Sequence, residues 1–254
     1  MRKTTPLLVL PLILLGAGAC TSHYAITGME RTRILIDKRF DATEDSSAKA
    51  FLAPYKKKVD SLMMPVVGQA ACNMSAGRPE SKLSNLLTDI LVWGGKQFGE
   101  KPDFAVYNIG GMRASLTKGD ITVGDVLNVA PFENKICFVS LTGEEVLQLF
   151  RQIAHRGGEG VSHSVRMRIT ADGQLRNATI DGQPIDPKAQ YRIATIDYVV
   201  QGNDGMTAFT KGTDLVSPQT EENNLRYFIM NYFRECMKEG VPVCGEIEGR
   251  ITME

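Results

Sequence analysis

The chain has 254 residues, 43% of them hydrophobic, which is enough to bury the core of one large domain or two small ones. Its 29 lysines and arginines balance 29 aspartates and glutamates. A chain with no net charge has no overall field to attract nucleic acid, so we expect no nucleic-acid partner. Any anion site must therefore depend on a few local arginines.

The first residues have the pattern of an export signal. Arg2 and Lys3 precede an apolar run, residues 7–15, that is too short to span a membrane. The run leads into Ala-Gly-Ala-Cys20, which is similar to the lipobox of bacterial lipoproteins. That similarity implies a signal peptide over residues 1–19 and a lipid on Cys20. Ordinary secretory cleavage is the alternative. In both cases the mature protein is exported, and lipidation would anchor it to a membrane of the cell envelope.

Export permits disulfide bonds, and four cysteines lie beyond Cys20. Cys236 and Cys244 are the closest pair in sequence, and whether they form a disulfide is left open. We expect Cys72 and Cys137 to be buried free thiols, since Cys137 lies inside an apolar strand pattern. The spacing of the four cysteines matches no metal motif.

Before residue 103 the sequence predicts a hairpin, two helices and a strand. The candidate hairpin strands, residues 24–27 and 32–36, flank Gly28 within the segment 21–44. A helix over residues 46–63 carries three consecutive lysines, which we interpret as a solvated face rather than a nucleic-acid patch. A strand is expected at residues 66–72. A second helix begins near Ser81, because leucine and isoleucine then recur on one face.

Residues 103–142 begin with an apolar run, 103–107, that is typical of a buried strand. A short helix follows around residues 123–129, and then a strand over residues 136–141. Thr142 and Glu145 form a capping-box pattern that begins another helix.

Farther on, residues 165–169 alternate apolar side chains with arginines, which predicts a half-buried strand. Asp-Gly pairs at 172–173 and 181–182 mark the turns of a meander. Residues 191–198 form the last strong strand, and a final helix with an apolar face from Leu225 to Cys236 ends at Gly240. This mixture predicts an α+β fold with mixed sheets.

One loop combines several residues suited to ligand binding. The strand 103–107 delivers Asn108 onto a turn with Gly110 and Gly111, where backbone can approach a ligand closely. Arg113 follows, a planar cation suited to phosphate or carboxylate. Taken alone, Arg113 could equally form a surface ion pair, and Asn108 a capped turn.

The loop belongs to a longer series of segments. Pro131-Phe132 follows it, and the cluster from Asp197 through Tyr198 to Asp204-Gly205 comes later. In this order, over about residues 66–211, these segments resemble the C-terminal substrate-binding domain of the 5′-nucleotidase family. The resemblance implies a layered α/β/β/α unit with mixed sheets. It divides the mature chain into an N-terminal segment, residues 20–45, and a 5′-nucleotidase C-terminal-like domain, residues 46–254.

The resemblance also implies roles for five residues. In the family, two aromatic side chains that match Phe132 and Tyr198 sandwich the base. Asp204 matches the aspartate that binds the ribose, and Asn108 and Arg113 match residues that orient the phosphate end. Without the resemblance, Phe132 would be interpreted as a core residue, Tyr198 as the end of a strand and Asp204 as part of a turn.

The match departs from the family pattern in places. Ile109 and Met112 replace a Gly and an Ile of the Asn-Gly-Gly-Gly-Ile-Arg motif, and Asn203 replaces a Gly of Gly-Gly-Asp-Gly. A further family arginine precedes a segment that matches Glu80 to Leu86. Arg78 stands near that position but out of register.

The catalytic half of the family is a dinuclear metallophosphoesterase with Asp-x-His, Gly-Asn-His-Asp/Glu and Gly-His-x-His motifs. This chain contains none of them. Of its histidines, His23 lies near the proposed lipid anchor. His155 is expected at a helix end, and His163, with the strand parity of Val165, in the core or at a sheet edge. We therefore expect no catalytic residue, cofactor or metal in this chain, with divalent metals only in a partner catalytic domain.

The resulting hypothesis is the nucleotide-binding half of a 5′-nucleotidase-type phosphohydrolase. It would act in nucleotide catabolism with a separate metallophosphatase chain, since positioning is a large part of phosphoryl-transfer catalysis. A second hypothesis is a non-catalytic lipoprotein that binds nucleotides or nucleosides for scavenging. A third is a structural envelope lipoprotein that has lost its pocket.

Overall fold

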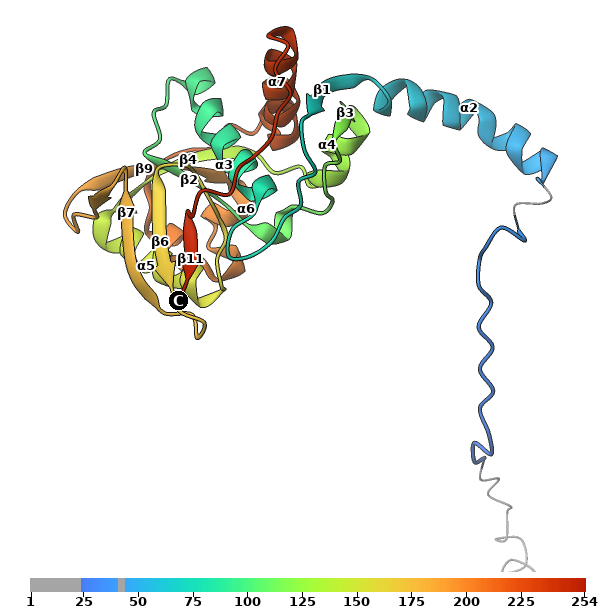
Figure 1. Ribbon diagram of the computed structural model, residues 1–254, viewed down its shortest axis with the longest axis horizontal. Helices are drawn as coiled ribbons and strands as arrows, with labels where there is room; N and C mark the ends of the chain where they lie inside the picture. The colour runs from blue at the N-terminus through green and yellow to red at the C-terminus, as the bar shows by residue number, and fades with distance from the viewer. Residues whose placement is uncertain (1–23, 41–43) are drawn as a thin grey trace, which may run out of the picture. The chain divides into compact units, whose positions relative to one another are not determined.

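The computed structural model describes residues 24–40 and 44–254, so the predicted signal peptide, Cys20 and His23 lie outside the described residues. The chain divides into two compact units, Met1–Phe51 and Leu52–Glu254. The second unit contains the sheets and the helices that pack on them (Figure 1). Among the described residues, no helix is both long enough and apolar enough to cross a membrane.

The hairpin predicted within residues 21–44 is wrong where the structure describes it. Residues 24–36 contain no strand, and their apolar side chains, such as those of Tyr24 and Ile36, are exposed. A turn forms instead at residues 38–40, where the Arg39 side chain binds the Asp37 carboxylate at 2.8 Å. Two isolated strands without a third strand or a helix to cover them have marginal stability in water.

The helix predicted over residues 46–63 is confirmed as α2, Ser46–Met63, and none of its residues is buried. Asp45 precedes it, and its carboxylate accepts bonds from the N–H groups of Ser47 and Ala48, at 2.9 and 3.1 Å. These bonds satisfy donors that a helix N-terminus would otherwise leave unpaired.

Three sheets form the framework of the second unit, and two of them mix parallel and antiparallel pairs. In the five-stranded sheet, β2 and β9 are parallel and the other neighbours antiparallel. The predicted α+β fold with mixed sheets is therefore confirmed. The strands are β10 (Thr213–Val216), β4 (Ile136–Thr142), β9 (Gln190–Ile196), β2 (Phe104–Tyr107) and β5 (Gly160–Val161) in the first sheet, β11 (Ile251–Met253), β6 (Val165–Ile169), β7 (Leu175–Ile180) and β8 (Gln183–Pro184) in the second, and β1 (Val66–Ala70) and β3 (Gly119–Thr122) in the third.

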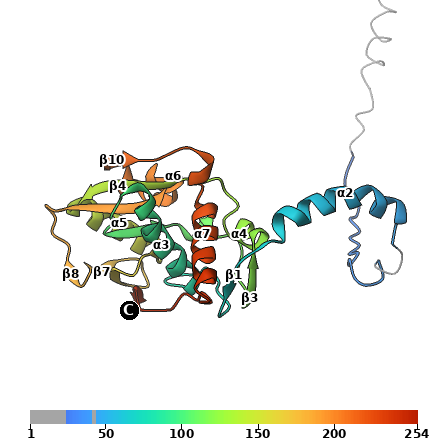
Figure 2. The same cartoon turned by 90° about the horizontal axis from the view of Figure 1, so that it is seen from above.

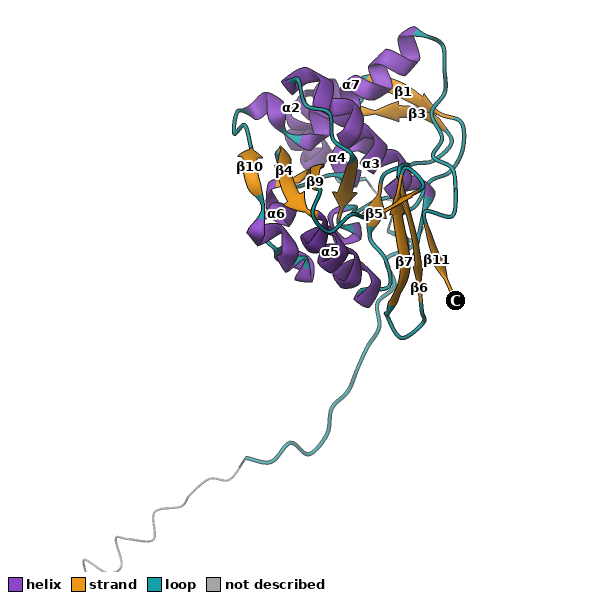
Figure 3. Cartoon of the chain, turned by 90° about the vertical axis from the view of Figure 1, so that its left-hand side faces the viewer, coloured by secondary structure: helices purple, strands orange, loops and turns teal. Residues whose placement is uncertain are grey.

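Helices cover both faces of the five-stranded sheet. On one face α3 packs against β2 and β5 and beside α7, and on the other α5 lies between β4 and β7 (Figures 2 and 3). The strand register explains why α5 packs on its face of the sheet. Ala105 and Phe138 both pair with Ala194, so these residues share one face. Phe104, the neighbour of Ala105, points to the opposite face, where its ring contacts Phe150 of α5. The helices of this unit are α3 (Lys82–Gly94), α4 (Val123–Val129), α5 (Gly143–His155), α6 (Asp197–Val200) and α7 (Leu225–Lys238), with short 3₁₀ helices η1 (Gly95–Phe98), η2 (Ile109–Gly111), η3 (Asn203–Gly205), η4 (Thr207–Lys211) and η5 (Glu221–Asn223).

Local sequence signals explain where these helices begin. Ser81, Thr122 and Thr142 each form a capping box, in which the side chain accepts the N–H of the residue three positions on. His155 ends α5, as predicted. By contrast β9 ends at Ile196, two residues before the predicted strand end at Tyr198, which lies in α6.

The cysteine pairing differs from the prediction. Cys72 and Cys244 form a disulfide, with their Cα atoms 5.7 Å apart, while Cys236 is free. The expectation of a free thiol was therefore wrong for Cys72, but it is confirmed for the buried Cys137. The tertiary structure determines this pairing. The Ala71 N–H donates to the Val243 carbonyl at 2.9 Å, and this bond brings the residues that follow, Cys72 and Cys244, side by side.

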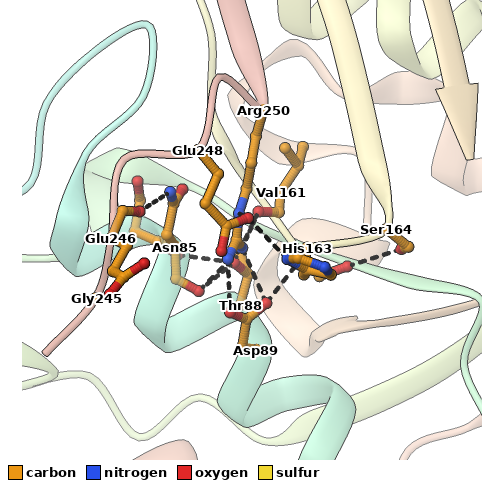
Figure 4. A network of polar contacts seen from close by, with 12 residues as sticks. Asn85, Thr88, Asp89, Val161, His163, Ser164, Gly245, Glu246, Glu248 and Arg250 are labelled. Carbon is orange, nitrogen blue, oxygen red and sulfur yellow. Dashed lines mark hydrogen bonds and ion pairs between the residues drawn. The ribbon is translucent and has the colours of Figure 1, made fainter. Parts of the chain in front are cut away.

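A buried arginine joins the end of the chain to the helical layer (Figure 4). Arg250 is 1% exposed, and its guanidinium donates to both carboxylate oxygens of Asp89 on α3, at 2.9 and 2.7 Å. It also donates to the Val161 carbonyl at 2.9 Å and to Glu248 at 3.0 Å. The bonds to Asp89 and Val161 hold the segment before β11 against α3 and β5, and the bond to Glu248 lies within that segment.

His163 lies at the edge of the same network and not in the core. Its side chain is exposed, and its Nδ1 lies 2.8 Å from Glu248 Oε2. The alternation of the strand that follows does not extend back to His163. Strand β5 ends at Val161 and β6 begins at Val165, and a turn lies between them.

Candidate functional site

Three chain segments meet at one edge of the five-stranded sheet. Because β2 and β9 are parallel neighbours, the residues that follow them, Asn108 and Tyr198, emerge on the same side. Strand β4 runs antiparallel to β9, so the residues that precede it, including Phe132, reach that side as well. The sheet thereby brings together side chains up to 96 positions apart in sequence, such as Asn108 and Asp204.

At this edge lies a cavity of about 410 Å³. All five residues assigned to substrate binding by resemblance line it, together with Gly110, Gly111 and Asn134. Asn134 is a lining residue that the sequence did not indicate. Its place two positions after Phe132, just before β4, is the only sequence signal that could have found it.

The aromatic residues of the cavity are accessible. Phe132 is 49% exposed and Tyr198 is 39% exposed. Phe132 is therefore not a core residue, and Tyr198 lies beyond the strand, in α6. Two exposed aromatic side chains lining one cavity leave apolar faces available to a planar ligand.

Asn108 lies at the cavity wall with one half of its amide paired. It is 3% exposed, and its Nδ2 donates to Asp204 Oδ2 at 2.7 Å. Its Oδ1 is buried and has no partner among the described residues. Gly111 must be glycine here, because a Cβ would lie 2.9 Å from both Asn108 Oδ1 and the Tyr107 ring.

Asp204 accepts contacts on both oxygens. Asn108 binds Oδ2, and Arg156 Nη2 lies 3.7 Å from Oδ1. The backbone of Asp204 has φ 54°, the left-handed region that non-glycine residues seldom adopt. The turn thus holds the carboxylate where it lines the cavity.

Arg113 is the one arginine that lines the cavity. Its guanidinium has a single long contact, from Nη1 to the Gly110 carbonyl at 3.4 Å, and forms no ion pair with any described residue. The surface ion pair that its position could have indicated is therefore not present in the described part of the chain. Its charge faces a cavity and is available to an anion.

Arg78 does not line the cavity. Its Nε donates to the Gly158 carbonyl at 2.7 Å, and its guanidinium pairs with the buried carboxylate of Glu159. Instead Arg156, which follows α5, is the arginine beside Asp204. Sequence reasoning missed both Arg156 and Glu159, which lie within residues 66–211 but belong to none of the motifs that carry the resemblance.

Neither this cavity nor any other part of residues 24–40 and 44–254 brings together three or more His, Cys, Asp or Glu side chains that could hold a metal ion. A second cavity, of about 350 Å³, lies between α5 and η4 and is lined mainly by polar and charged side chains, with no aromatic residue. Of these two cavities in the described residues, the one at the sheet edge is therefore the one suited to a ligand with both planar and charged parts.

Comparison with known proteins gives the class to which this fold and cavity belong. The model of the 5′-nucleotidase C-terminal domain matches residues 66–211, more than half of the chain. The chain belongs to this family. Its relatives include protein UshA of Escherichia coli, 26% identical over 168 residues, which make up 65% of this chain and 30% of UshA. A 5′-nucleotidase of Vibrio cholerae is 29% identical over 170 residues, 66% of this chain and 31% of that protein.

Solved structures of 5′-nucleotidases and related proteins have the same fold as this chain. A 5′-nucleotidase precursor from Thermus thermophilus superposes with a TM-score of 0.71 and 29% identity, over 85% of this chain and 44% of that chain. The NAD nucleotidase of Haemophilus influenzae, at 18% identity and a TM-score of 0.62, shares the fold over 83% of this chain and 41% of its own. The chain thus spans less than half the length of these relatives.

Proposed function

We propose that this protein binds a nucleotide or nucleoside in the cavity at the sheet edge. The observation that supports this best is the joint placement of Phe132, Tyr198, Asp204, Asn108 and Arg113 around one cavity. Its volume of about 410 Å³ falls in the range of about 300–1,000 Å³ common for small-molecule sites.

The chemistry of the lining fits each part of such a ligand. A base needs flat apolar faces, which Phe132 and Tyr198 offer. Ribose hydroxyls need acceptors, which the Asp204 carboxylate supplies, and a phosphate needs a cation, which Arg113 supplies. A purely apolar ligand would leave Asp204 and Arg113 without partners.

We further propose that the protein supplies the substrate-binding half of a phosphohydrolase that acts in nucleotide catabolism. The metals and the attacking water would come from a separate metallophosphatase chain. Two observations support this. Relatives such as the Vibrio cholerae protein are named 5′-nucleotidases, and this chain covers only about a third of their length. This chain also carries none of the metal-binding motifs of the catalytic half.

Export to the cell envelope and a lipid on Cys20 complete the proposal. They are supported by the basic start, the apolar run and the Ala-Gly-Ala-Cys20 ending of the first twenty residues. Labelling with a fatty acid tests for the lipid. The wild type should incorporate the label and Cys20→Ala should not, and equal labelling of both proteins would contradict lipidation at Cys20.

Calorimetry with adenosine and AMP tests the binding proposal. Phe132→Ala and Tyr198→Ala should each weaken binding by about 1–3 kcal/mol, the contribution of one lost base–aromatic stack. The matched control is Ile247→Ala, which removes an apolar side chain, 57% exposed, that does not line the cavity. If both aromatic variants bind as tightly as the wild type and remain folded, the cavity is not a base-binding site.

A non-catalytic scavenging lipoprotein is the second candidate function. The same cavity supports it, because binding alone requires no partner chain. The two functions differ in whether a metallophosphatase gains activity on nucleotides when this protein is added.

A further inference from the structure

A buried carboxylate behind the cavity joins three segments that are distant in sequence. The side chain of Glu159 is fully buried. Its Oε1 accepts from Arg156 Nε at 2.6 Å and also from Arg78, and its Oε2 accepts the Ile109 backbone N–H at 2.5 Å. A buried charge is costly unless it is paired and hydrogen-bonded, and here both oxygens are satisfied.

Two of these contacts lead directly to the ligand cavity. Ile109 follows Asn108, so Glu159 holds the loop that presents the Asn108 amide. Arg156 extends from Glu159 to Asp204, where its Nη2 lies 3.7 Å from Oδ1. Since Asn108 Nδ2 binds the other oxygen, Glu159 supports the Asp204 carboxylate from both sides.

The charge of Arg156 is secure in this position. Burial is the largest influence on the Arg156 pKa and lowers it. The hydrogen bond to Glu159 and the charges of Glu159 and Asp204 act in the opposite direction and outweigh burial, so the pKa is raised. A raised pKa keeps the Arg156 guanidinium charged, as an arginine side chain ordinarily is in proteins.

Arg156, and not Arg78, is the arginine beside the Asp204 carboxylate. The Arg78 guanidinium is engaged by Glu159 and the Gly158 carbonyl and does not line the cavity. The cation beside Asp204 comes instead from the residue that follows α5. Arg156 is not a lining residue itself, so it acts on the ligand through Asp204.

We propose that Arg156, held by Glu159, is a positioning residue that fixes the Asp204 carboxylate so that it accepts the two neighbouring hydroxyls of a ribose. A carboxylate held on one edge by Arg156 and on the other by Asn108 cannot rotate freely, so its remaining lone pairs keep one direction. The ligand class rests on the proposed function, whereas the positioning of Asp204 rests on the contacts of Glu159 and Arg156.

The test compares a ligand that has both hydroxyls with one that has neither. Calorimetry with adenosine and 2′,3′-dideoxyadenosine is performed on the wild type, Arg156→Met and Arg156→Lys. Arg156→Met should bind adenosine about tenfold more weakly, the size of one lost charge-assisted contact, and dideoxyadenosine unchanged. Arg156→Lys should recover part of the loss, because it restores the charge.

Arg151→Met is the matched control, since Arg151 is an exposed arginine on the same helix, α5, and does not line this cavity. It should leave both affinities unchanged. A merely structural role of Arg156 would weaken both ligands alike, and that result, or no loss for adenosine, overturns the proposal.

A ligand-independent measurement separates this inference from the proposed function. In ¹⁵N-labelled protein, the side-chain amide signal of Asn108 reports its bond to Asp204. The signal should move in Arg156→Met and stay in place in Arg151→Met. If the wild type binds neither adenosine nor AMP, the proposed function fails, and this signal alone decides the inference. An unmoved signal in Arg156→Met overturns it.

Discussion

Arg113 and Arg156 have different surroundings although both carry charge near the same cavity. Arg156 is bound between two carboxylates, Glu159 and Asp204, which neutralise it. Arg113 has no carboxylate partner within the described residues. The side of the cavity near Arg113 is therefore the side that would accept a negative group.

Replacing Arg113 should therefore separate nucleotides from nucleosides. Arg113→Ala is expected to weaken AMP binding by about 1.5–3 kcal/mol, because a hydrogen bond to a charged group is lost, and to leave adenosine nearly unaffected. Calorimetry with both ligands measures the difference. The control is Lys118→Ala, an exposed cation outside the cavity. Equal losses for both ligands would mean that the phosphate points elsewhere.

At the scale of the elements, strand direction determines the site. The parallel pair β2 and β9 and the antiparallel strand β4 bring three loops to one sheet edge. The loops themselves contain the irregular backbone, such as the left-handed turn at Asp204, while β2 below them is fully buried. A rigid sheet with variable loops at its edge is a common arrangement for binding sites.

The final segment of the chain is fastened at two separate points. The Cys72–Cys244 disulfide ties it next to β1, and Arg250 ties it to α3 through Asp89. Neither residue pair lines the ligand cavity. These links should therefore affect stability more than binding.

Removing the disulfide should lower stability without lowering affinity. The bond joins cysteines 172 positions apart, so it strongly restricts the unfolded chain. Loss of such a link typically costs about 2–5 kcal/mol. Cys72→Ser/Cys244→Ser is expected to unfold at a lower denaturant concentration than the wild type and to bind nucleotide equally well.

The free cysteine Cys236 provides the control, since Cys236→Ser breaks no disulfide. Denaturant unfolding followed by fluorescence, with and without reductant, measures the effect. If reductant lowers the midpoint of Cys72→Ser/Cys244→Ser as much as that of the wild type, the disulfide is not the cause.

At the scale of the whole molecule, the chain corresponds to a part of its relatives. It covers 30% of protein UshA and 44% of the Thermus thermophilus 5′-nucleotidase precursor. Its cavity lies at the sheet edge and is lined by Arg113, a cation without a carboxylate partner among the described residues. Such a site could be completed by another domain or chain. This arrangement is the geometric argument for the proposed division of labour between binding and chemistry.

The purified protein alone should not hydrolyse nucleotides, even with added divalent metal, because it carries none of the metal-binding motifs of the catalytic half. Adding a lone metallophosphatase chain from the same organism should raise activity on AMP relative to a generic phosphate ester. Phosphate release measures both activities. Asn108→Ala/Arg113→Ala should remove the gain on AMP and leave the generic activity.

Metal-dependent AMP hydrolysis by this chain alone, persisting after removal of contaminants, would contradict the division of labour. Nucleotide binding without any stimulation of the metallophosphatase would instead favour the scavenging lipoprotein.

Local patterns predicted most of the secondary structure. Side-chain spacing and capping residues such as Thr142 act within a few positions, so the helices 46–63 and 143–155 could be predicted directly. The hairpin predicted within residues 21–44 failed over residues 24–36 because its pattern lacked tertiary support. For His163, expected in the core or at a sheet edge, the core position is excluded because a turn breaks the strand pattern. Short strands with exposed side chains, such as β10, carry no such pattern.

For the site, resemblance to a family predicted which residues gather, but not how they are connected. Phe132, Tyr198, Asp204, Asn108 and Arg113 do line one cavity. Asn134, Arg156 and Glu159 lie outside the recognised motifs. Arg156 and Glu159 could be found only from their contacts, and Asn134 only from its place just before β4.

The sequence by itself determined the local elements, the mixed α+β character and the family, because each depends on residue types at short spacing or on motifs in a given order. Only the tertiary structure decided the Cys72–Cys244 pairing, the surface position of His163 and the arginine that stands beside Asp204. These depend on which distant segments the sheets bring within bonding distance. Hydrogen bonds and ion pairs act over a few ångströms in space, and distance along the chain does not reveal them.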